Sequence, residues 1–525
     1  MKRKSLGLLL SALLILPLFT GCGGEEKPGG QSSVPQNGPS EERRIASQLV
    51  LARSVDGNAF DPIQAYRNED IWVQELMYDC LVRSSDDGQE DLMNLAESYT
   101  VSDDGLTYTF KLVPGIKFSD GSDVTAEDWV YSLNRLKEFE DCYWHGSAEQ
   151  MEEITAPDKD TLVIKLAAPR PAFITELGMF SFAVVSKADG EANYTVGDKT
   201  YVPVGTGPYV LKEWKVGEYV LYEKNPYYRG EVKSDSIKIL TVADDNSRMM
   251  MLQSGDVDIV LSVPYSHIAA LQNSPDVRVE SFEASQLRQL VFNVTKPPFD
   301  NIKLRQALYM AIDKQQLVDM VTQGYGVVGS SYLSPGVKYR VEGLDKDGYN
   351  PEKAKQLLAE AGYPDGLEIE MMNHSGNVEY EQIATILKDQ WSKIGVDLKI
   401  TTVETGSLWD MMSELKQTMT IGRWAEDMND PMMWSNYCWV YKVSDGNSTG
   451  YKDDKLEAYA LASDAETDEA KRAEMYKTLQ EVRYELCVDP ILYYAKYVVA
   501  MNKDVEGFWQ TPLGKYRLND TCRYE

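Results

Sequence analysis

The sequence has 525 residues, of which 82 are acidic and 53 are lysine or arginine, so its formal charge is −29 at neutral pH. This balance argues against nucleic-acid binding and against docking of a basic face on anionic lipid. A hydrophobic content of 43% is typical of a packed globular protein, and the length exceeds the usual domain size of about 100–200 residues.

The N-terminal segment has the pattern of a signal peptide. Three basic residues (2–4) precede an apolar stretch at 5–20. That stretch is shorter than the roughly 20 apolar residues that a membrane-spanning helix needs. We therefore expect a signal peptide over residues 1–21, and no other apolar run is long enough to span a membrane.

The end of this segment, Phe19-Thr20-Gly21-Cys22, resembles the lipobox of bacterial lipoproteins, with Phe19 where leucine is usual. The resemblance implies that Cys22 is acylated, becomes the mature N-terminus and anchors the protein to the membrane. The alternative is an ordinary secretory signal in which Cys22 has no role.

Residues 22–45 are predicted to be a flexible tether. They are rich in Gly, Pro, Ser, Gln and Glu, and such a composition cannot bury enough apolar surface to offset the entropy of ordering. The remaining cysteines are odd in number and show no framework spacing, which leaves at least one thiol unpaired within the chain: Cys80, Cys142, Cys438, Cys487 and Cys522.

Strand and helix patterns alternate along the rest of the chain. Strands are predicted at 48–53 (QLVLAR) and 107–112 (TYTFKL), and helical periodicity covers 126–137 and 303–321. Thr125 is predicted to cap the helix that follows it, with Asp128 three residues on. The chain is therefore predicted to be a mixed α and β protein.

Four long blocks resemble one family, the extracytoplasmic solute-binding proteins of family 5, which bind oligopeptides or dipeptides for ABC importers. The blocks occur in the family's order, at residues 95–136, 203–230, 252–260 and 291–319. The resemblance covers the chain from about residue 46 to the C-terminus.

This resemblance implies an α/β, two-lobed periplasmic-binding-protein-like fold (type II, cluster C) with the ligand enclosed at a hinge. The first lobe would comprise residues 46–285 and 490–525, and the second lobe residues 286–489. The family's extra subdomain would occupy about 71–200.

The sequence GRWAEDMNDP (422–431) is the main candidate for a binding site. It resembles the family motif Trp-x-x-Asp-x-x-(Asp/Glu)-Pro, which implies that Asp427 pairs with the ligand's α-amino group beside the ring of Trp424. A carboxylate and an aromatic ring together suit an ammonium ligand. Asp430, which precedes Pro431, is predicted to cap a helix.

Four other positions are candidate ligand contacts. Thr405 follows Glu404 where well-known members carry a tryptophan, so one ring of the usual pocket is missing. Arg423 is a candidate for holding a carboxylate, since the family's arginine position is not occupied by arginine here. Glu426 points either into the pocket or to solvent, and Asn447 either reaches the ligand or forms an ordinary turn.

These features predict a lipid-anchored, monomeric binding protein on the extracytoplasmic face of the membrane. It would capture oligopeptides and deliver them to an ABC permease by lobe closure, without cofactor, catalysis or nucleic acid. One alternative is a binder of a nickel chelate or another small amine-bearing solute. A secreted hydrolase is a second alternative, and it would need two convergent carboxylates or a nucleophile and a base in the cleft.

Overall fold

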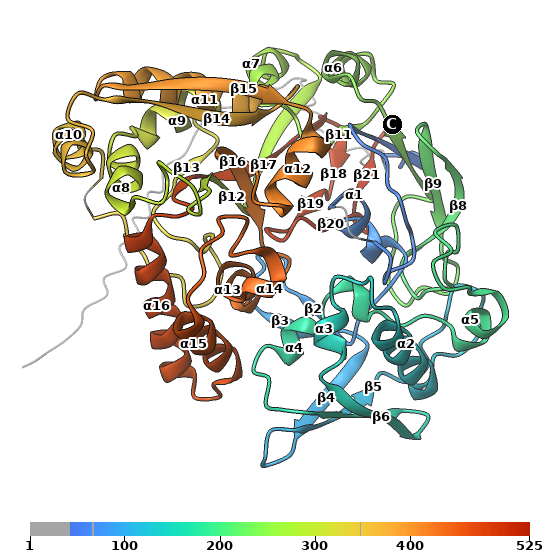
Figure 1. Cartoon of the computed structure of the whole chain (residues 1–525). Helices are drawn as coiled ribbons and strands as arrows, with labels where there is room; N and C mark the ends of the chain where they lie inside the picture. Colours follow the sequence, from blue (N-terminus) through green and yellow to red (C-terminus); the bar gives the residue numbers. More distant parts are fainter. Residues whose placement is uncertain (1–42, 66–67, 347) are drawn as a thin grey trace, which may run out of the picture. The chain divides into compact units, whose positions relative to one another are not determined.

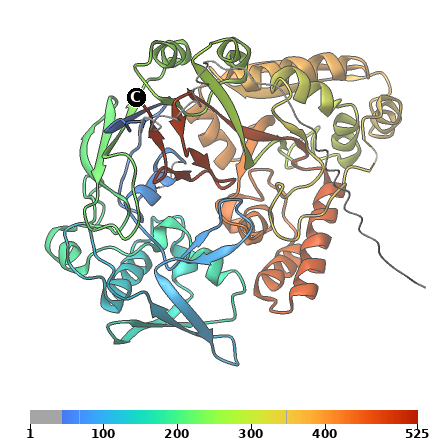
Figure 2. The ribbon, with the colours of Figure 1, turned by 180° about the vertical axis from the view of Figure 1, so that it is seen from behind.

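The structure is a computed structural model that describes residues 43–65, 68–346 and 348–525. The predicted signal peptide (1–21), Cys22 and the tether up to residue 42 lie outside the described residues. The first described residues pair with the C-terminal end of the chain, through an antiparallel β-bridge between Ile45 and Tyr524. Figure 2 shows the red C-terminal strands beside this blue segment.

In the described part of the chain, the largest sheet has nine strands and mixes parallel with antiparallel neighbours (Figure 1). The order is β16 (Met419–Ala425), β12 (Val277–Phe292), β17 (Ile491–Asn502), β11 (Ile259–Val260), β1 (Gln48–Arg53), β10 (Ser236–Thr241), β9 (Tyr219–Lys224) and β8 (Tyr209–Lys215), with β13 (Val327–Val328) also pairing with β17. β1 runs parallel to β10 and β11, whereas the other neighbours are antiparallel. The predicted strand 48–53 is confirmed.

The pairing of the two longest strands, β12 and β17, is irregular between Phe282 and Gln286. Such an irregularity bends a strand and increases its twist. The predicted boundary between the lobes, 285/286, falls within this interruption. The lobe limits 46–285 with 490–525, and 286–489, remain predictions.

A separate four-stranded antiparallel sheet lies within the range predicted for the extra subdomain (71–200). Its order is β4 (Ala96–Val101), β5 (Thr107–Leu112), β7 (Thr161–Leu166) and β6 (Met151–Asp158). The predicted strand 107–112 is confirmed. So is the helix after Thr125, because α2 (Ala126–Glu138) begins there and the Thr125 amide donates to Asp128 Oδ2 at 2.9 Å. The shorter helices of this range, together with α1 just before it, are α1 (Asn68–Ile71), η1 (Gln74–Leu76), α3 (His145–Ala148), α4 (Phe173–Glu176), η2 (Phe180–Phe182) and α5 (Lys187–Asn193).

A two-stranded parallel sheet, β14 (Leu367–His374) with β15 (Val396–Val403), packs against α11 (Val378–Ser392). The helical pattern at 303–321 forms two helices, α8 (Ile302–Met310) and α9 (Lys314–Val321). The break occurs because the Asp313 side chain accepts a hydrogen bond from the Gln316 amide and caps a new helix. A cap inside a periodic apolar pattern therefore divides it.

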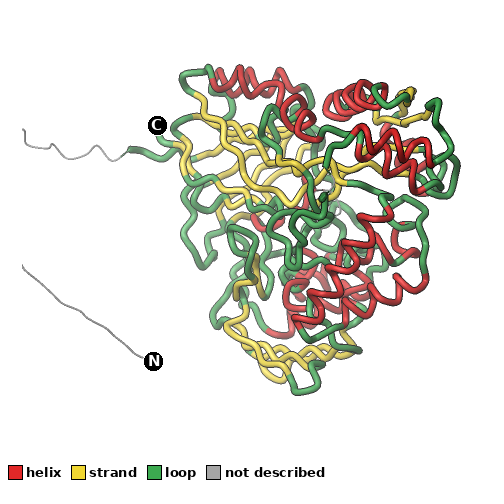
Figure 3. The backbone as a smooth tube through the Cα atoms, turned by 90° about the vertical axis from the view of Figure 1, so that its left-hand side faces the viewer, coloured by secondary structure: helices red, strands yellow, loops and turns green. Residues whose placement is uncertain are grey.

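The remaining elements complete the described fold, in which helices and strands are interspersed (Figure 3). The other helices are α6 (Asp245–Ser254), α7 (Tyr265–Gln272), α10 (Pro351–Glu360), α12 (Thr405–Ser413), α13 (Met432–Trp439), α14 (Tyr441–Ser444), α15 (Asp454–Ala465) and α16 (Glu469–Leu486). Three short antiparallel sheets of two strands each pair β2 (Val82–Ser84) with β3 (Asp91–Met93), β18 (Val505–Glu506) with β21 (Cys522–Arg523), and β19 (Trp509–Gln510) with β20 (Tyr516–Arg517).

The cysteines of the described chain are all free and buried: Cys80, Cys142, Cys438, Cys487 and Cys522. Among the described residues, we find no helix that combines the length and the hydropathy required to cross a membrane.

Candidate ligand-binding site

A cavity of about 380 Å³ brings together segments that are far apart in the sequence. One group of lining residues lies between 65 and 180, and the other lies between 286 and 437, so the cavity joins ranges that the sequence assigned to different lobes. Its walls are strongly aromatic. The lining residues are Ala65, Asn68, Ile71, Tyr143, Trp144, Phe180, Gln286, Trp409, Arg423, Trp424, Ala425, Asp427, Met433 and Tyr437.

Asp427 lines this cavity just beyond the end of β16. No described residue forms a hydrogen bond or an ion pair with its carboxylate. Burial raises the pKa of Asp427 to about 6, while the positive charge of Lys515 acts in the opposite direction. The group is therefore mostly ionised at neutral pH, and a cation in the cavity would supply the partner that the protein does not.

Trp424 lies on β16 and presents its ring to the cavity. The ring packs against Tyr437 with centroids 4.9 Å apart, and its indole Nε1 donates to Glu426 Oε1 at 2.8 Å. These two contacts fix the orientation of the ring.

Glu426 does not line the cavity and is not exposed to solvent, since only 1% of its surface is accessible. It lies beneath Trp424, and its Oε2 is buried without a hydrogen-bond partner in the described chain. Burial, opposed by the bond from Trp424 and reinforced by the charges of Asp427 and Asp430, raises the pKa of Glu426 to about 8. The group is therefore mostly protonated, and so uncharged, at neutral pH.

Arg423 is exposed to the same cavity as Asp427. Within the described residues its guanidinium has no hydrogen-bond or ion-pair partner. The cavity thus presents one unpaired cation and one unpaired anion between aromatic walls. Such an arrangement is complementary to a small molecule that carries both an ammonium and a carboxylate.

Thr405 does not line the cavity, because it is the exposed first residue of α12, whose N-terminus is capped by Glu404. Trp409, one turn further along α12, does line it and packs against His374 with centroids 5.2 Å apart. Position 405 carries no ring, and Trp409 supplies an aromatic ring to the cavity from the next turn of the same helix.

Asn447 is also absent from the cavity lining, since its Nδ2 donates to Asp489 Oδ2 at 3.0 Å. Asp489 in turn is paired with the buried Arg483 at 2.7 Å. Cys22, the predicted site of lipidation, lies outside the described residues.

Asp430 has two contacts. Its Oδ1 accepts a hydrogen bond from the Met432 amide at 3.0 Å, and α13 begins at Met432, one residue later than the pattern predicts. Both carboxylate oxygens also accept hydrogen bonds from Arg472 of α16, at 2.7 and 2.9 Å. Asp430 therefore joins two helices in addition to capping one.

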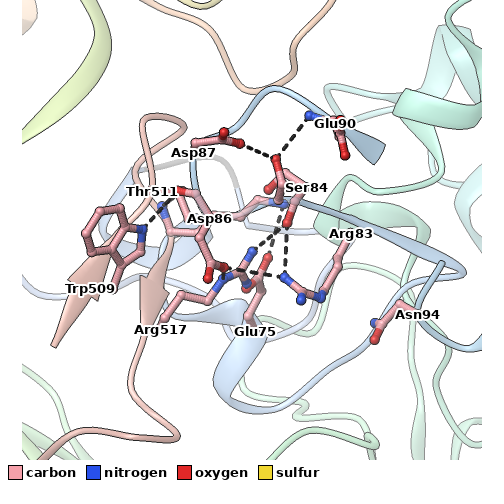
Figure 4. Close-up of polar contacts among 12 residues, drawn as sticks. Glu75, Arg83, Ser84, Asp86, Asp87, Glu90, Asn94, Trp509, Thr511 and Arg517 are labelled. Carbon is pink, nitrogen blue, oxygen red and sulfur yellow. Dashed lines mark hydrogen bonds and ion pairs between the residues drawn. The ribbon is translucent and has the colours of Figure 1, made fainter. Parts of the chain in front are cut away.

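A second cavity, of about 310 Å³, shares Ile71 and Phe180 with the first. Most of its charged groups are paired with one another (Figure 4). Glu75 accepts from Arg517 and lies 3.2 Å from Lys515 Nζ, and Asp86 lies 3.4 Å from Arg517 and 3.5 Å from Arg83. Most charges in this cavity are therefore balanced within the protein, in contrast to Arg423 and Asp427 in the first.

Sequence reasoning did not find several of the residues around the site. Trp409, Tyr143, Trp144, Tyr437 and Lys515 come from four separate segments. The chain has 32 tyrosines and 10 tryptophans, so aromatic identity by itself carries no positional signal. In the described chain, no three His, Cys, Asp or Glu side chains are arranged to hold a metal ion.

Comparison with known proteins identifies the family. Residues 93–445 match the bacterial extracellular solute-binding proteins, family 5, in the middle region of that family. The chain belongs to this family. Its members are extracytoplasmic components of ABC importers that bind a solute, and the described fold is that of their two-lobed binding proteins.

Relatives within family 5 bear several ligand names. The chain is 29% identical over 447 residues to heme-binding protein A of Haemophilus influenzae, covering 80% of this chain and 82% of that protein. It is 29% identical over 490 residues to the glutathione-binding protein GsiB of Escherichia coli K12, covering 90% and 94%. The structure of DppA of Helicobacter pylori in complex with the peptide STSA superposes with a TM-score of 0.79 at 24% identity, covering 92% and 99%.

Proposed function

We propose that this family 5 protein captures short peptides, or closely related zwitterionic amines, and delivers them to an ABC permease. The ligand's ammonium pairs with Asp427, and its carboxylate pairs with Arg423. The observation that carries this proposal is the presence of two opposite, unpartnered charges in one aromatic-walled cavity. If the cavity closes over a ligand and excludes water, a charge left unpaired there costs more free energy than one that is paired.

The size of the cavity favours a small ligand. A volume of about 380 Å³ lies at the lower end of the range of about 300–1,000 Å³ that is usual for small-molecule sites. The names of relatives that bind glutathione or a tetrapeptide support the same ligand class. Closure of two lobes over the ligand would exclude water and strengthen both ion pairs.

Acylation of Cys22 and anchoring at the extracytoplasmic face belong to the same proposal. A tethered protein stays close to its permease while its folded part remains free to close on a ligand.

The test pairs each end of the ligand with one side chain. A panel of di- to tetrapeptides is titrated calorimetrically in free, N-acetylated and C-amidated form. Asp427→Asn should weaken binding of the free peptide by on the order of 2–5 kcal/mol, since one partner of a desolvated pair is lost. N-acetylation should cost the wild type a similar amount and cost Asp427→Asn much less, because both changes remove the same interaction.

The matching double-mutant cycle for the ligand's carboxylate compares the wild type and Arg423→Gln, each with free and with C-amidated peptide. Asp410→Asn, an exposed acid on α12, is the control and should leave affinity unchanged. Small-angle scattering on the same titration should show a smaller radius of gyration at saturation. Equal losses on acetylation in the wild type and in Asp427→Asn would show that Asp427 does not hold the amine.

A further inference from the structure

Asp427 lies between the ligand cavity and a third, much smaller cavity, since it lines both. The small cavity is also lined by Asp91, Gly178 and Lys515, and it is too small to accept a ligand. Asp427 therefore has the ligand cavity on one side and shares the small cavity with Lys515.

Lys515 is held in a rigid turn that precedes β20. The Thr511 amide donates to the Lys515 carbonyl at 3.0 Å, and the Lys515 amide donates to Thr511 Oγ1 at 3.1 Å. Gly514 has a φ of +88°, and a Cβ there would lie 2.1 Å from the indole nitrogen of Trp72. The turn thus requires glycine and packs tightly against Trp72, so the position of Lys515 is well defined.

The ammonium of Lys515 has few acceptors of its own. With 3% of its surface accessible, it donates to the Gly178 carbonyl at 3.1 Å and lies 3.2 Å from Glu75 Oε1. Glu75 also accepts from Arg517 (Figure 4), so it is shared between Arg517 and Lys515. The positive charge of Lys515 is therefore only partly balanced on the Glu75 side.

The other charged groups around Asp427 do not supply a counter-ion from behind. Glu426 is uncharged at neutral pH, and Asp91 accepts a hydrogen bond from Thr175 and is itself an acid. Arg423 lies on the ligand side of the partition. Three tyrosines have pKa values that burial and the charge of Asp427 raise, so they are neutral: Tyr143, Tyr437 and Tyr497.

We propose that Lys515 is the internal counter-ion of Asp427 and that it determines how strongly, and over which pH range, the cavity selects ammonium ligands. This inference rests on the proposed role of Asp427 in holding the ligand's amine. Lys515 does not touch the ligand, and it acts as a positioning residue through Asp427.

Two opposing effects follow from this arrangement. Lys515 keeps Asp427 ionised in spite of its burial, which favours capture of a cation at mildly acidic pH. The same positive charge repels the ligand's ammonium, which limits affinity once Asp427 is fully ionised. Removal of Lys515 should therefore weaken binding at low pH and strengthen it at high pH, a crossover that simple structural damage does not produce.

The first test needs no ligand. Melting temperature is measured from pH 4 to 9 for the wild type, Asp427→Asn, Lys515→Met and the double variant. At each pH, the melting temperature with the Asp427 carboxyl is compared with the melting temperature of the matching Asp427→Asn protein. This difference reports the ionisation of Asp427, because a carboxyl whose pKa is raised in the folded state lowers stability as the pH rises. The loss of stability caused by the Asp427 carboxyl should accumulate as the pH rises above the ordinary aspartate pKa and should level off near pH 6 in the wild type, and at a higher pH with Lys515→Met.

Lys314→Met is the matched control, since Lys314 is also a buried lysine held by a carbonyl and a carboxylate, those of Gly329 and Asp345. It should lower the melting temperature without changing the pH at which the effect of the Asp427 carboxyl levels off. If Lys515→Met does not fold, Lys515→Gln removes the charge and retains a donor for Gly178. An effect of Asp427 that levels off at the wild-type pH in either Lys515 variant would overturn the proposal.

The second test uses the tetrapeptide STSA and glutathione as probes, between pH 5.5 and 8. The affinity curves of wild type and Lys515→Met should cross, with the variant binding more weakly at pH 5.5 and more tightly at pH 8. A parallel loss at every pH would mean that Lys515 is merely structural and would overturn the proposal. Failure of both probes to bind counts against the proposed function, and the first test then still decides the role of Lys515.

Discussion

At the scale of single residues, the site combines two acids that are neighbours in sequence but differ in environment. Glu426 is enclosed beneath Trp424 and is neutral, whereas Asp427 faces a cavity and is mostly ionised at neutral pH. Two adjacent carboxylates in a buried region would repel each other if both were charged, and burial of Glu426 removes that repulsion. The neutral acid accepts the indole hydrogen bond that orients the ring, and the charged acid remains available to the ligand.

This difference predicts the behaviour of Glu426→Gln. Gln retains the acceptor for Trp424 Nε1 and cannot ionise, so peptide affinity at pH 7 should be unchanged. Because the pKa of Glu426 is raised from 4.5 to about 8 in the folded state, the wild type should lose stability as the pH rises from about 4.5 to 8. The melting temperature of Glu426→Gln relative to wild type should therefore increase across that range and then level off.

Glu426→Leu is the companion variant, since it removes the acceptor as well as the acid. It should leave the indole of Trp424 without a partner and weaken peptide binding, which calorimetry would detect. A Glu426→Gln variant with a flat stability difference from pH 4.5 to 8 would contradict the assignment of a neutral Glu426.

At the scale of elements, α13 is tied to α16 by a buried ion pair. Asp430 precedes α13 and forms two hydrogen bonds with Arg472, which also donates to the Ser463 carbonyl of α15. One arginine thus connects three helices whose sequences are separated by loops. This pair positions α13, which contributes Met433 and Tyr437 to the ligand cavity.

Removal of one partner of this buried ion pair should greatly lower the free energy of unfolding. Asp430→Asn leaves Arg472 buried without its carboxylate, so the free energy of unfolding should fall by on the order of 3–5 kcal/mol, measured by chemical denaturation. Asp468→Asn is the control, because Asp468 is an exposed N-cap of α16 whose loss should cost about 1 kcal/mol or less. If the two variants lost equal stability, Asp430 would act only as a cap.

At the scale of the whole molecule, the proposal combines a folded binding protein with an N-terminal anchor. If the predicted tether behaves as a random coil of about 20 residues, it would span on the order of 25 Å on average. We propose that such a length would keep the binding protein near the membrane.

The anchor predicts a separable phenotype for Cys22→Ser. The variant should be released from the membrane fraction while its melting temperature and peptide affinity remain those of the wild type, since the predicted tether that begins at Cys22 is not expected to contribute to the core. Fractionation of expressing cells, followed by intact-mass analysis of the mature protein, measures this. A wild-type protein that is unmodified and released would contradict acylation.

Local pattern in the sequence was sufficient for several elements. β1 and β5 are six-residue segments in which apolar residues alternate with polar ones or cluster, and α2 follows Thr125 with an acid three residues on. The bounds of each element could therefore be predicted to within one residue. Trp424 and Asp427, which follow a motif, and the neighbouring Arg423 line one cavity, and their roles in ligand binding stay predictions. The division of 303–321 into α8 and α9 was not apparent, since the apolar period continues through the Asp313 cap.

Only the tertiary structure decided which distant residues complete the site. Trp409 replaces the ring absent at Thr405, and Glu426 lies under Trp424 rather than in the cavity or in solvent. Lys515 reaches the back of Asp427 from 88 positions further along the chain. The physical reason is that local periodicity reports which face of an element is buried, whereas the charge state of a carboxyl depends on every group packed around it, wherever those groups lie in the sequence.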